Sequence, residues 1–425
     1  MVADNRLLGA DFIRACACSI VMLHHLAQRV DGRTAFGQQA WVQVFNAVGG
    51  FGVAMFFVLS GFLLARPFWR AFDAGQPFPS LRTYALRRTA RIVPGFWLAL
   101  TVTFVLSFTI FGAVLDGWLV LRYLAGLLLV SDWHWTTLFP VEINGPLWSI
   151  GFEVTSYVLL PLGFCALFAL GRGRLVGWPA RIAWLAVIAA ALAAHWLFFN
   201  FVDVDQTRRG WNFGLQGGAK TWMPWFNPFG FFAMFAIGAL AGGVQVKLAR
   251  VRSVAYDVLC LGGIGAAAWM LWRNGLSGPS DFHGLLGIPY DFPVYHLAIG
   301  LVLAVTPSSV VVGRLLDNPV VTYVAQISFG LYVWHYVILE LVRVYWLVDI
   351  DHGSMADPAR FFVGAAVILG ITAVVADLSY RWLEKPVINW ARRLEPVARS
   401  GPPPSIPPHK GEGGDPASAQ HHATS

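Results

Sequence analysis

Charged residues are scarce in this sequence. Of its 425 residues, 12% are Asp, Glu, Lys or Arg, whereas 57% are hydrophobic. Soluble domains carry about 25% charged and roughly 45–50% apolar residues. A chain with so little charge cannot enclose so much apolar surface in one soluble core. The composition therefore excludes a soluble globular protein and predicts that lipid is the solvent.

Cysteines are also few, and their positions exclude a disulfide framework. All four lie inside apolar stretches, at Cys16, Cys18, Cys165 and Cys260, where small buried side chains are the expected interpretation. Cys16 and Cys18 have no second Cys or His pair nearby to complete a zinc site. We therefore expect no metal centre.

We also expect no cleavable signal peptide. The first apolar run follows Arg6 and contains Asp11, Arg14, His24 and His25, with no small-residue cleavage site after it. We expect this run to be retained as a membrane helix.

Apolar stretches long enough to span a membrane recur along the chain. A spanning helix needs about 20 mostly apolar residues. Such segments lie near 7–29, 43–65, 92–114, 147–170, 182–201, 225–246, 254–272, 292–312, 320–348 and 361–383. The stretch 117–130 is apolar but short, so we expect an interfacial or re-entrant helix there. The predicted fold class is an all-α, polytopic transmembrane bundle of about ten spans.

The net charge of +7 predicts topology rather than nucleic-acid binding, because the basic residues sit in short runs between the apolar segments. With both termini cytoplasmic, 20 of the 30 Lys and Arg fall on the inner side and 9 on the outer side. This bias predicts an N-in, C-in protein. Residues 1–390 would form the membrane domain. The Pro- and Gly-rich segment 391–425 would be a disordered cytoplasmic tail, with no second soluble domain in the chain.

Ionisable side chains within the first apolar run are candidate functional groups, because burying charge in a bilayer is costly. Arg14 and His25 are 11 residues apart, which places them on one helix face about 16 Å apart. Asp11 can pair with Arg14, and His24 points about 100° away from His25. An Arg holding a phosphate and a distant His acting as a base would suit a long, thin donor. A structural Asp11–Arg14 pair with a capping His25 is an equally strong interpretation.

Glu153 is the second candidate, inside the apolar span that begins near Leu147. If that span starts at the outer surface, Glu153 lies about 9 Å deep and His25 about 7 Å deep. Equal depth would allow Glu153 to orient His25. A protonated Glu153 bonding to other helices is the competing interpretation.

Two further clusters carry polar groups at helical spacing. Arg88 and Arg91 lie one turn apart at the expected cytoplasmic mouth, where they would either bind a phosphate headgroup or act as topology anchors. Ser328, Tyr332 and His335 share one face of a later span, and helix packing is the alternative explanation for them.

These motifs, taken together and in order, resemble membrane-bound acyltransferase family 3, the O-acyltransferases of bacterial surface glycans and natural products. The likeness extends over about residues 6–386. The matching segments are RLLGADFIRACACSIVMLHH, FGVAMFFVLSGFLLARPF, RRTARIVPGFW, GPLWSIGFEVTSYVLLPL, ISFGLYVWH and YRWLEKPVINW.

The resemblance implies acyl-CoA, with acetyl-CoA as the expected form, as a cytoplasmic co-substrate, with no tightly bound cofactor. It implies a carbohydrate-containing acceptor outside the cytoplasm, such as lipopolysaccharide or exopolysaccharide, and a multi-pass protein of the bacterial inner membrane. His25 would be the catalytic histidine and Arg14 its partner in donor handling. Arg88 and Arg91 match the Arg-x-x-Arg feature, and Glu153 matches the acidic residue after the Trp-Ser pair. Some relatives carry an additional esterase-like domain, which we do not expect here.

Other classes of membrane protein remain alternatives. A transporter or flippase for a lipid-linked glycan or small molecule also needs many spans and intramembrane charges, but the sequence shows no internal repeat and no paired, interrupted spans. A membrane scaffold or receptor would not need charges at matched depth.

Overall fold

The computed structural model describes residues 7–141, 143–171, 175–202, 219, 222–249, 251–277, 284–347 and 350–395. Within these residues, nine helical stretches are long and apolar enough to cross a membrane. They contain α1 (Ala10–Ala27), α3 (Gly49–Asp73), α4 (Leu81–Thr109), α6 (Trp148–Gly171), α7 (Trp178–Phe201), α9 (Pro228–Leu248), α10 (Val254–Ser277), α13 (Pro319–Tyr345) and α14 (Pro358–Ser379).

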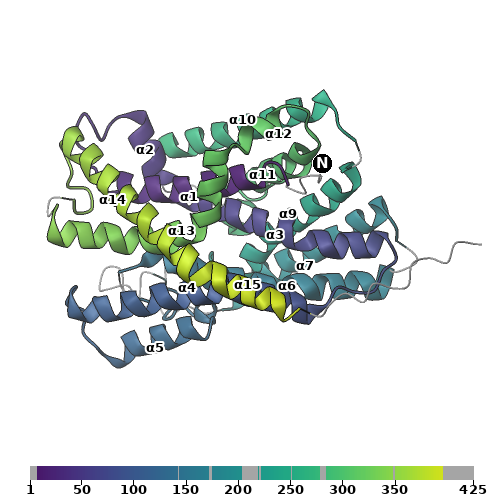
Figure 1. Cartoon of the computed structure of the whole chain (residues 1–425), viewed down its shortest axis with the longest axis horizontal. Helices are drawn as coiled ribbons and strands as arrows, with labels where there is room; N and C mark the ends of the chain where they lie inside the picture. Colours follow the sequence, from purple (N-terminus) through teal and green to yellow (C-terminus); the bar gives the residue numbers. More distant parts are fainter. Residues whose placement is uncertain are drawn as a thin grey trace, which may run out of the picture.

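Shorter elements complete the bundle. They are α2 (Ala40–Ala47), α5 (Gly117–Leu127), α11 (Val294–Val305), α12 (Val312–Leu316) and α15 (Lys385–Arg393), the 3₁₀ turns η1 (Ser131–Trp133), η2 (Gly145–Leu147), η3 (Leu285–Gly287) and η4 (Thr306–Ser308), and the π-helical turn η5 (Tyr380–Glu384). In Figure 1 most of the long helices run roughly along the long axis of the molecule.

The all-α prediction is confirmed for the described residues. The ten expected segments correspond to the nine long stretches and to the shorter apolar stretch Val294–Ser308. The helix expected at 92–114 begins eleven residues earlier, at Leu81, because its basic first turns are helical although they are not apolar. The stretch expected at 117–130 contains the eleven-residue helix α5, which packs on α4. Helix α15 continues to Arg393, and the expected tail lies outside the described residues from 396 onward.

Several helices begin at a polar cap that is followed directly by proline. Asn227, Asn318 and Asp357 each accept hydrogen bonds from the first backbone N–H groups of α9, α13 and α14. This pairing satisfies the free donors, and proline at the first helical position has no N–H to lose. The start of α1 is capped from a distance, because Asp317 accepts hydrogen bonds from the backbone N–H groups of Gly9 and Phe12.

Helices α3 and α9 form the centre of the bundle, and glycines bring their backbones into contact. A Cβ atom added at Gly61 would lie 1.9 Å from the carbonyl oxygen of Phe235, and one added at Gly238 would lie 1.9 Å from that of Val58. Close approach through small residues is a common way for helices to associate in lipid, where the hydrophobic effect contributes little. Helix α1 packs against both α3 and α13, which places its polar residues inside the bundle.

Candidate functional site

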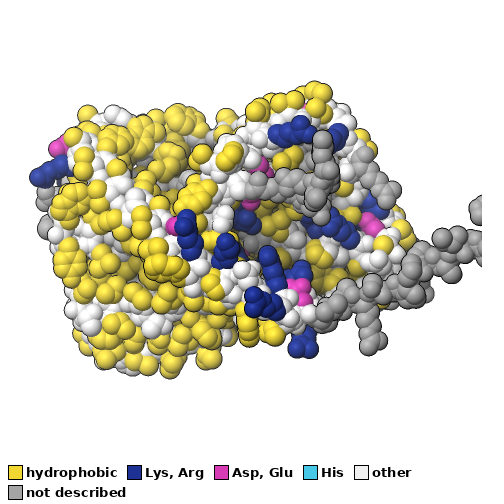
Figure 2. Space-filling view, viewed as in Figure 1, with side chains coloured by type: hydrophobic (Ala, Val, Ile, Leu, Met, Phe, Trp, Pro, Cys, Tyr) yellow, Lys and Arg dark blue, Asp and Glu magenta, His cyan; other side chains and the backbone are white. Residues whose placement is uncertain are grey.

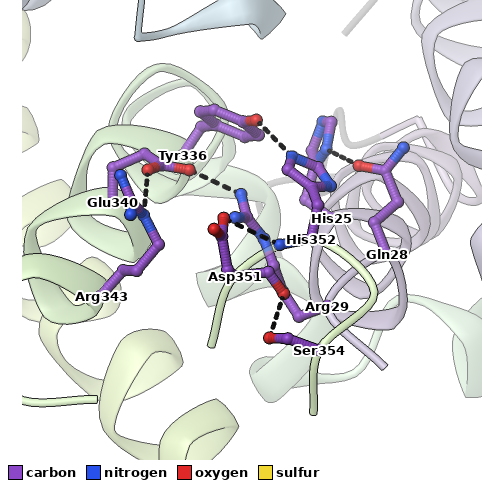
Figure 3. Close-up of polar contacts among 9 residues, drawn as sticks. All are labelled: His25, Gln28, Arg29, Tyr336, Glu340, Arg343, Asp351, His352 and Ser354. Atoms are coloured by element: carbon purple, nitrogen blue, oxygen red, sulfur yellow. Dashed lines mark hydrogen bonds and ion pairs between the residues drawn. The ribbon is translucent and has the colours of Figure 1, made fainter. Parts of the chain in front are cut away.

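His25 lies two residues before the end of α1, and a single side chain fixes its ring (Figure 3). Its Nδ1 is 3.0 Å from Oε1 of Gln28. Because an amide oxygen can only accept, Nδ1–H is the donor. The other ring nitrogen, Nε2, then carries the lone pair that a general base needs.

Three aromatic rings surround the imidazole of His25. His335 of α13 stacks on it with ring centroids 5.2 Å apart, and Tyr336 meets it edge-on at 4.8 Å. His24 also lies 4.8 Å from it, but the Nδ1–H of His24 donates to the carbonyl of Phe45 at 3.0 Å. The Nδ1–H of His335 donates to the carbonyl of Tyr332 at 2.7 Å. The two neighbouring histidines are thus held by backbone, whereas His25 is held by a side chain.

A buried ion pair lies directly behind this group. Arg29 is fully buried and donates to Oε1 of Glu340 at 2.7 Å, while Arg343 donates to Oε2 of the same carboxylate at 2.8 Å. The guanidinium of Arg29 also lies over the ring of Tyr336, 5.6 Å from its centroid. Glu340 therefore joins the end of α1 to α13 at the level of the His25 ring.

The loop after α13 closes over the same residues (Figure 3). The backbone N–H of Gly353 donates to the carbonyl of Gln28 at 2.9 Å, and the backbone N–H of Met355 donates to the carbonyl of Arg29 at 2.8 Å. Burial, with Arg29 nearby, lowers the pKa of His352 below its ordinary value. Its neutral Nε2 lies 3.3 Å from the hydroxyl of Tyr336 and can accept that proton. The loop thereby fixes the backbone that carries Gln28.

A cavity of about 550 Å³ opens beside His25, at the end of the bundle where α9 and α11 begin. His24, His25, Gln28 and Asn46 supply polar groups to its wall. Six of the remaining wall residues are aromatic: Trp148, Trp222, Trp225, Phe226, Tyr290 and Tyr332. A mixed wall of this kind can hold a small organic ring and orient its polar edge.

A second cavity, of about 660 Å³, lies toward the end where α1 and α4 begin. Arg14, Arg88 and Arg91 all line it, so the three arginines singled out in the sequence do gather in one place. Asp11 pairs with Arg14 at 3.5 Å, as its spacing predicts. Figure 2 shows Lys and Arg side chains around a hollow on this face of the molecule.

A narrow space of about 100 Å³ lies between the two cavities and shares wall residues with both. It shares Arg14, Arg88 and Arg91 with the basic cavity, and it shares Val53 and Tyr332 with the His25 cavity. Ser328 also lines this space, while His335 stacks on His25 one turn beyond Tyr332. The polar face of α13 therefore extends from the space beside the arginines to His25.

The contact expected between Glu153 and His25 is not formed in the structure. Glu153 lines the narrow space and accepts hydrogen bonds from Ser60, at 3.1 Å, and from the hydroxyl of Tyr157. His25 bonds to Gln28 instead. The prediction that Glu153 orients His25 is therefore wrong.

The error comes from the assumed depth of α6. Its first turns do not lie at the surface, because η2 and the start of α6 dock on the middle of α13. The side-chain amide of Asn144 donates to the backbone carbonyl of Val333 at 2.9 Å. The hydroxyl of Tyr332 donates to the backbone carbonyl of Pro146 at 2.8 Å. Ser149 is thus level with Tyr332, and Glu153 lies one turn further along, beside the arginines.

Sequence reasoning missed Gln28, Tyr336 and Tyr157. Gln28 stands just beyond the apolar run, three residues after His25, and a neutral amide gives no charge signal. Tyr157 follows Glu153 by four residues, which is the spacing of helix neighbours and could have indicated the pair. Among the described residues, no group of three or more His, Cys, Asp and Glu side chains could hold a metal ion.

Comparisons with known proteins identify the family of this chain. A family model described as an acyltransferase domain matches residues 7–377. The chain is 24% identical over 396 residues to the O-acetyltransferase OatA of Staphylococcus aureus strain NCTC 8325, covering 91% of this chain and 58% of that protein. It is 22% identical over 404 residues to a putative O-acetyltransferase of S. aureus strain COL, covering 90% and 58% respectively.

The chain thus spans 58% of the length of these curated relatives. No solved structure is significantly similar to it. The family model nevertheless covers nearly the whole described membrane bundle, including α1 with Arg14 and His25, α4, α6 and α13. The chain is a multi-pass membrane protein and belongs to acyltransferase family 3.

Proposed function

We propose that the chain is an integral membrane O-acyltransferase of the bacterial inner membrane. It moves an acyl group, acetyl in the first instance, from acyl-CoA on the cytoplasmic side to a hydroxyl of an extracytoplasmic glycan or glycoconjugate. One observation carries this proposal: the basic cavity at Arg14, Arg88 and Arg91 and the aromatic cavity at His25 both share wall residues with the narrow space between them.

The two cavities suit the two ends of acyl-CoA. The donor carries phosphates at one end and a thioester at the other, joined by a long, thin linker. Guanidinium groups bind phosphates through paired N–H donors. Arg14 and His25 are separated by 11 residues of one helix, about 16 Å, so a linker along α1 would bring the thioester to His25. Glu153, between them, can accept hydrogen bonds from amide N–H groups of that linker.

The aromatic cavity suits a carbohydrate acceptor. Sugar rings have apolar C–H faces and a rim of hydroxyls, and the wall around His25 offers indole and phenol rings together with imidazole and amide groups. The name of the S. aureus relatives, O-acetyltransferase, fits a hydroxyl as the accepting group. An acceptor hydroxyl held against this wall would face the free Nε2 of His25.

In the proposed reaction His25 acts as a general base. Its Nε2 takes the proton of the acceptor hydroxyl while that oxygen attacks the thioester carbonyl. The new C–O ester bond forms, the C–S bond breaks, and the proton passes from His25 to the departing thiolate. Gln28 holds Nδ1–H throughout and keeps Nε2 facing the reactants. Formation of a transient acyl-His25 is the alternative sequence of bond changes.

The proposed direction requires both termini to be cytoplasmic, which the excess of basic residues on that side supports. A cytoplasm-dependent reporter fused after Arg399 should be active, and a periplasm-dependent reporter at the same point should be silent. Activity of the periplasm-dependent reporter would reverse the orientation and contradict a cytoplasmic donor.

The decisive test uses the purified full chain in nanodiscs with acetyl-CoA. Wild-type protein should release coenzyme A thiol faster than empty nanodiscs, and an added glycan acceptor should gain an acetyl ester in proportion. His25→Ala serves as the inactive control. No thiol release above empty nanodiscs, with any acceptor tried, would count against acyl transfer from acyl-CoA.

A further inference from the structure

Helix α15 lies across the mouth of the basic cavity. It follows α14 through the π-helical turn η5, and Figure 1 shows α15, in yellow, continuing across α4. Two ion pairs fix it there. Arg87 of α4 binds the carboxylate of Glu395 through two contacts, one of 2.7 Å, and Arg91 lies 3.5 Å from Glu384. Both ends of α15 are therefore tied to α4.

Helix α15 places its own cations in the wall of this cavity. Lys385, Asn389 and Arg392 line it, together with Arg87, Arg88 and Arg91 from α4 and Arg14 from α1. Lys385 and Arg392 are seven residues apart, so they share one helix face about 10 Å apart. Both are exposed, as groups that meet a ligand from solution must be.

The charges around the cavity are unbalanced. Six cationic side chains line it, and the described residues in its wall include no Asp or Glu. Three of the arginines pair with carboxylates that do not line the cavity: Arg14 with Asp11, Arg91 with Glu384 and Arg87 with Glu395. Those three carboxylates leave a surplus of positive charge facing an empty volume of about 660 Å³. Like charges held so close favour a ligand that carries several negative charges.

We propose that the inner face of α15 forms part of the donor site and that Lys385 and Arg392 bind phosphates of the coenzyme A nucleotide. Two cations about 10 Å apart match two separate phosphate groups better than one. Coenzyme A has two such groups, a pyrophosphate and a ribose 3′-phosphate. The arginines of α4 and α1 contact the nucleotide from the other walls of the cavity. Asn389 offers an amide between the two cations.

This inference rests on the proposed function, because it assumes acyl-CoA as the donor. An anionic lipid headgroup offers the same phosphate chemistry, since basic amphipathic helices bind acidic membrane surfaces. Lipid composition therefore has to be varied separately from the nucleotide.

The test measures equilibrium binding of coenzyme A and of 3′-dephospho-coenzyme A to the full chain in nanodiscs of phosphatidylcholine. Lys385→Ala and Arg392→Ala should each weaken coenzyme A binding about tenfold, the usual effect of losing one charge-assisted hydrogen bond. One of the two should also lose the wild-type preference for coenzyme A over the dephospho form. Arg392→Lys should restore most of the affinity.

Arg393→Ala is the matched control, because Arg393 carries the same charge on the same helix but does not line the cavity. It should bind coenzyme A like wild type. Equal affinity in Lys385→Ala, Arg392→Ala and Arg393→Ala would overturn the inference. So would a loss of affinity that appears only with phosphatidylglycerol in the nanodisc, which would assign the cations to lipid.

The outcome separates this inference from the proposed function. If wild-type protein binds coenzyme A through α15 but releases no thiol from acetyl-CoA, the phosphate site stands and the reaction is wrong. If it releases thiol but the α15 variants bind normally, the reaction stands and the phosphate site is wrong. If wild type does not bind coenzyme A, both fail.

Discussion

Gln28 lies 3.0 Å from Nδ1 of His25, one turn further along the chain, and its amide oxygen accepts the ring proton. Its backbone carbonyl is held in turn by Gly353 of the loop that follows α13. The orientation of His25 therefore depends on a residue outside α1 and on a loop that is distant in sequence.

Replacing Gln28 by Leu should lower kcat about tenfold and leave the KM for acetyl-CoA unchanged. The substitution removes one hydrogen bond of about 1 kcal/mol, close to the 1.36 kcal/mol that corresponds to a tenfold change in rate. Under the proposed function the donor binds at the arginines, away from Gln28, so KM should not respond. Steady-state thiol release at varied acetyl-CoA measures both constants. A rise in KM with unchanged kcat would show that Gln28 contacts the donor instead.

His25→Ala should abolish acyl transfer, whereas His24→Ala should retain most of it. Loss of a general base costs typically 10²- to 10⁴-fold in rate. His24 donates to the carbonyl of Phe45 and packs against Gly49, so its replacement should affect the α2–α3 corner more than the reaction. Turnover is normalised to the amount of folded protein in the membrane. Near wild-type turnover in His25→Ala would remove His25 from the site.

The sequence predicts the helices of the bundle well because hydropathy is a property of single segments. Apolar runs located the spans, and the Arg14–Asp11 spacing predicted their pairing. The gathering of Arg14, Arg88 and Arg91 followed from placing both segments at the same side of the membrane.

The depth of Glu153 could not be predicted in the same way. It depends on the docking of Asn144 and Pro146 on α13, a contact between segments about 190 residues apart. Hydropathy cannot show that an apolar helix begins inside the bundle. Gln28 was missed for a related reason, because its role depends on a loop fixed by tertiary contacts.

Gly238→Ala should destabilise the bundle, and Gly262→Ala should not. A methyl group at Gly238 would meet the backbone of Val58 at 1.9 Å, where no side chain can move aside. Overpacking of this kind costs about 1–3 kcal/mol or more. Nothing lies within 4 Å of a Cβ at Gly262 of α10, so alanine there should gain helix propensity. Thermal unfolding in detergent compares the two; equal midpoints would contradict the close packing of α3 and α9.

Replacing Glu340 should lower the stability of the protein more than replacing Arg29, its partner in the buried ion pair. In Glu340→Leu, the fully buried Arg29 loses its carboxylate, and removing one partner of a buried pair costs about 3–5 kcal/mol. In Arg29→Met, Glu340 keeps its bond to Arg343, so the loss of stability should be smaller.

The double variant Arg29→Met, Glu340→Leu should be more stable than Glu340→Leu alone, because it leaves no unpaired guanidinium in the interior. Arg33→Met provides a control, since Arg33 pairs with Asp31 at the surface and such pairs contribute little. Unfolding midpoints in detergent rank the four proteins.

Because Arg29 adjoins Gln28 and its carbonyl accepts from Met355, Glu340→Leu should also lower kcat in the protein that remains folded. Equal stability of Glu340→Leu and Arg33→Met would show that the buried pair does not hold α1 to α13.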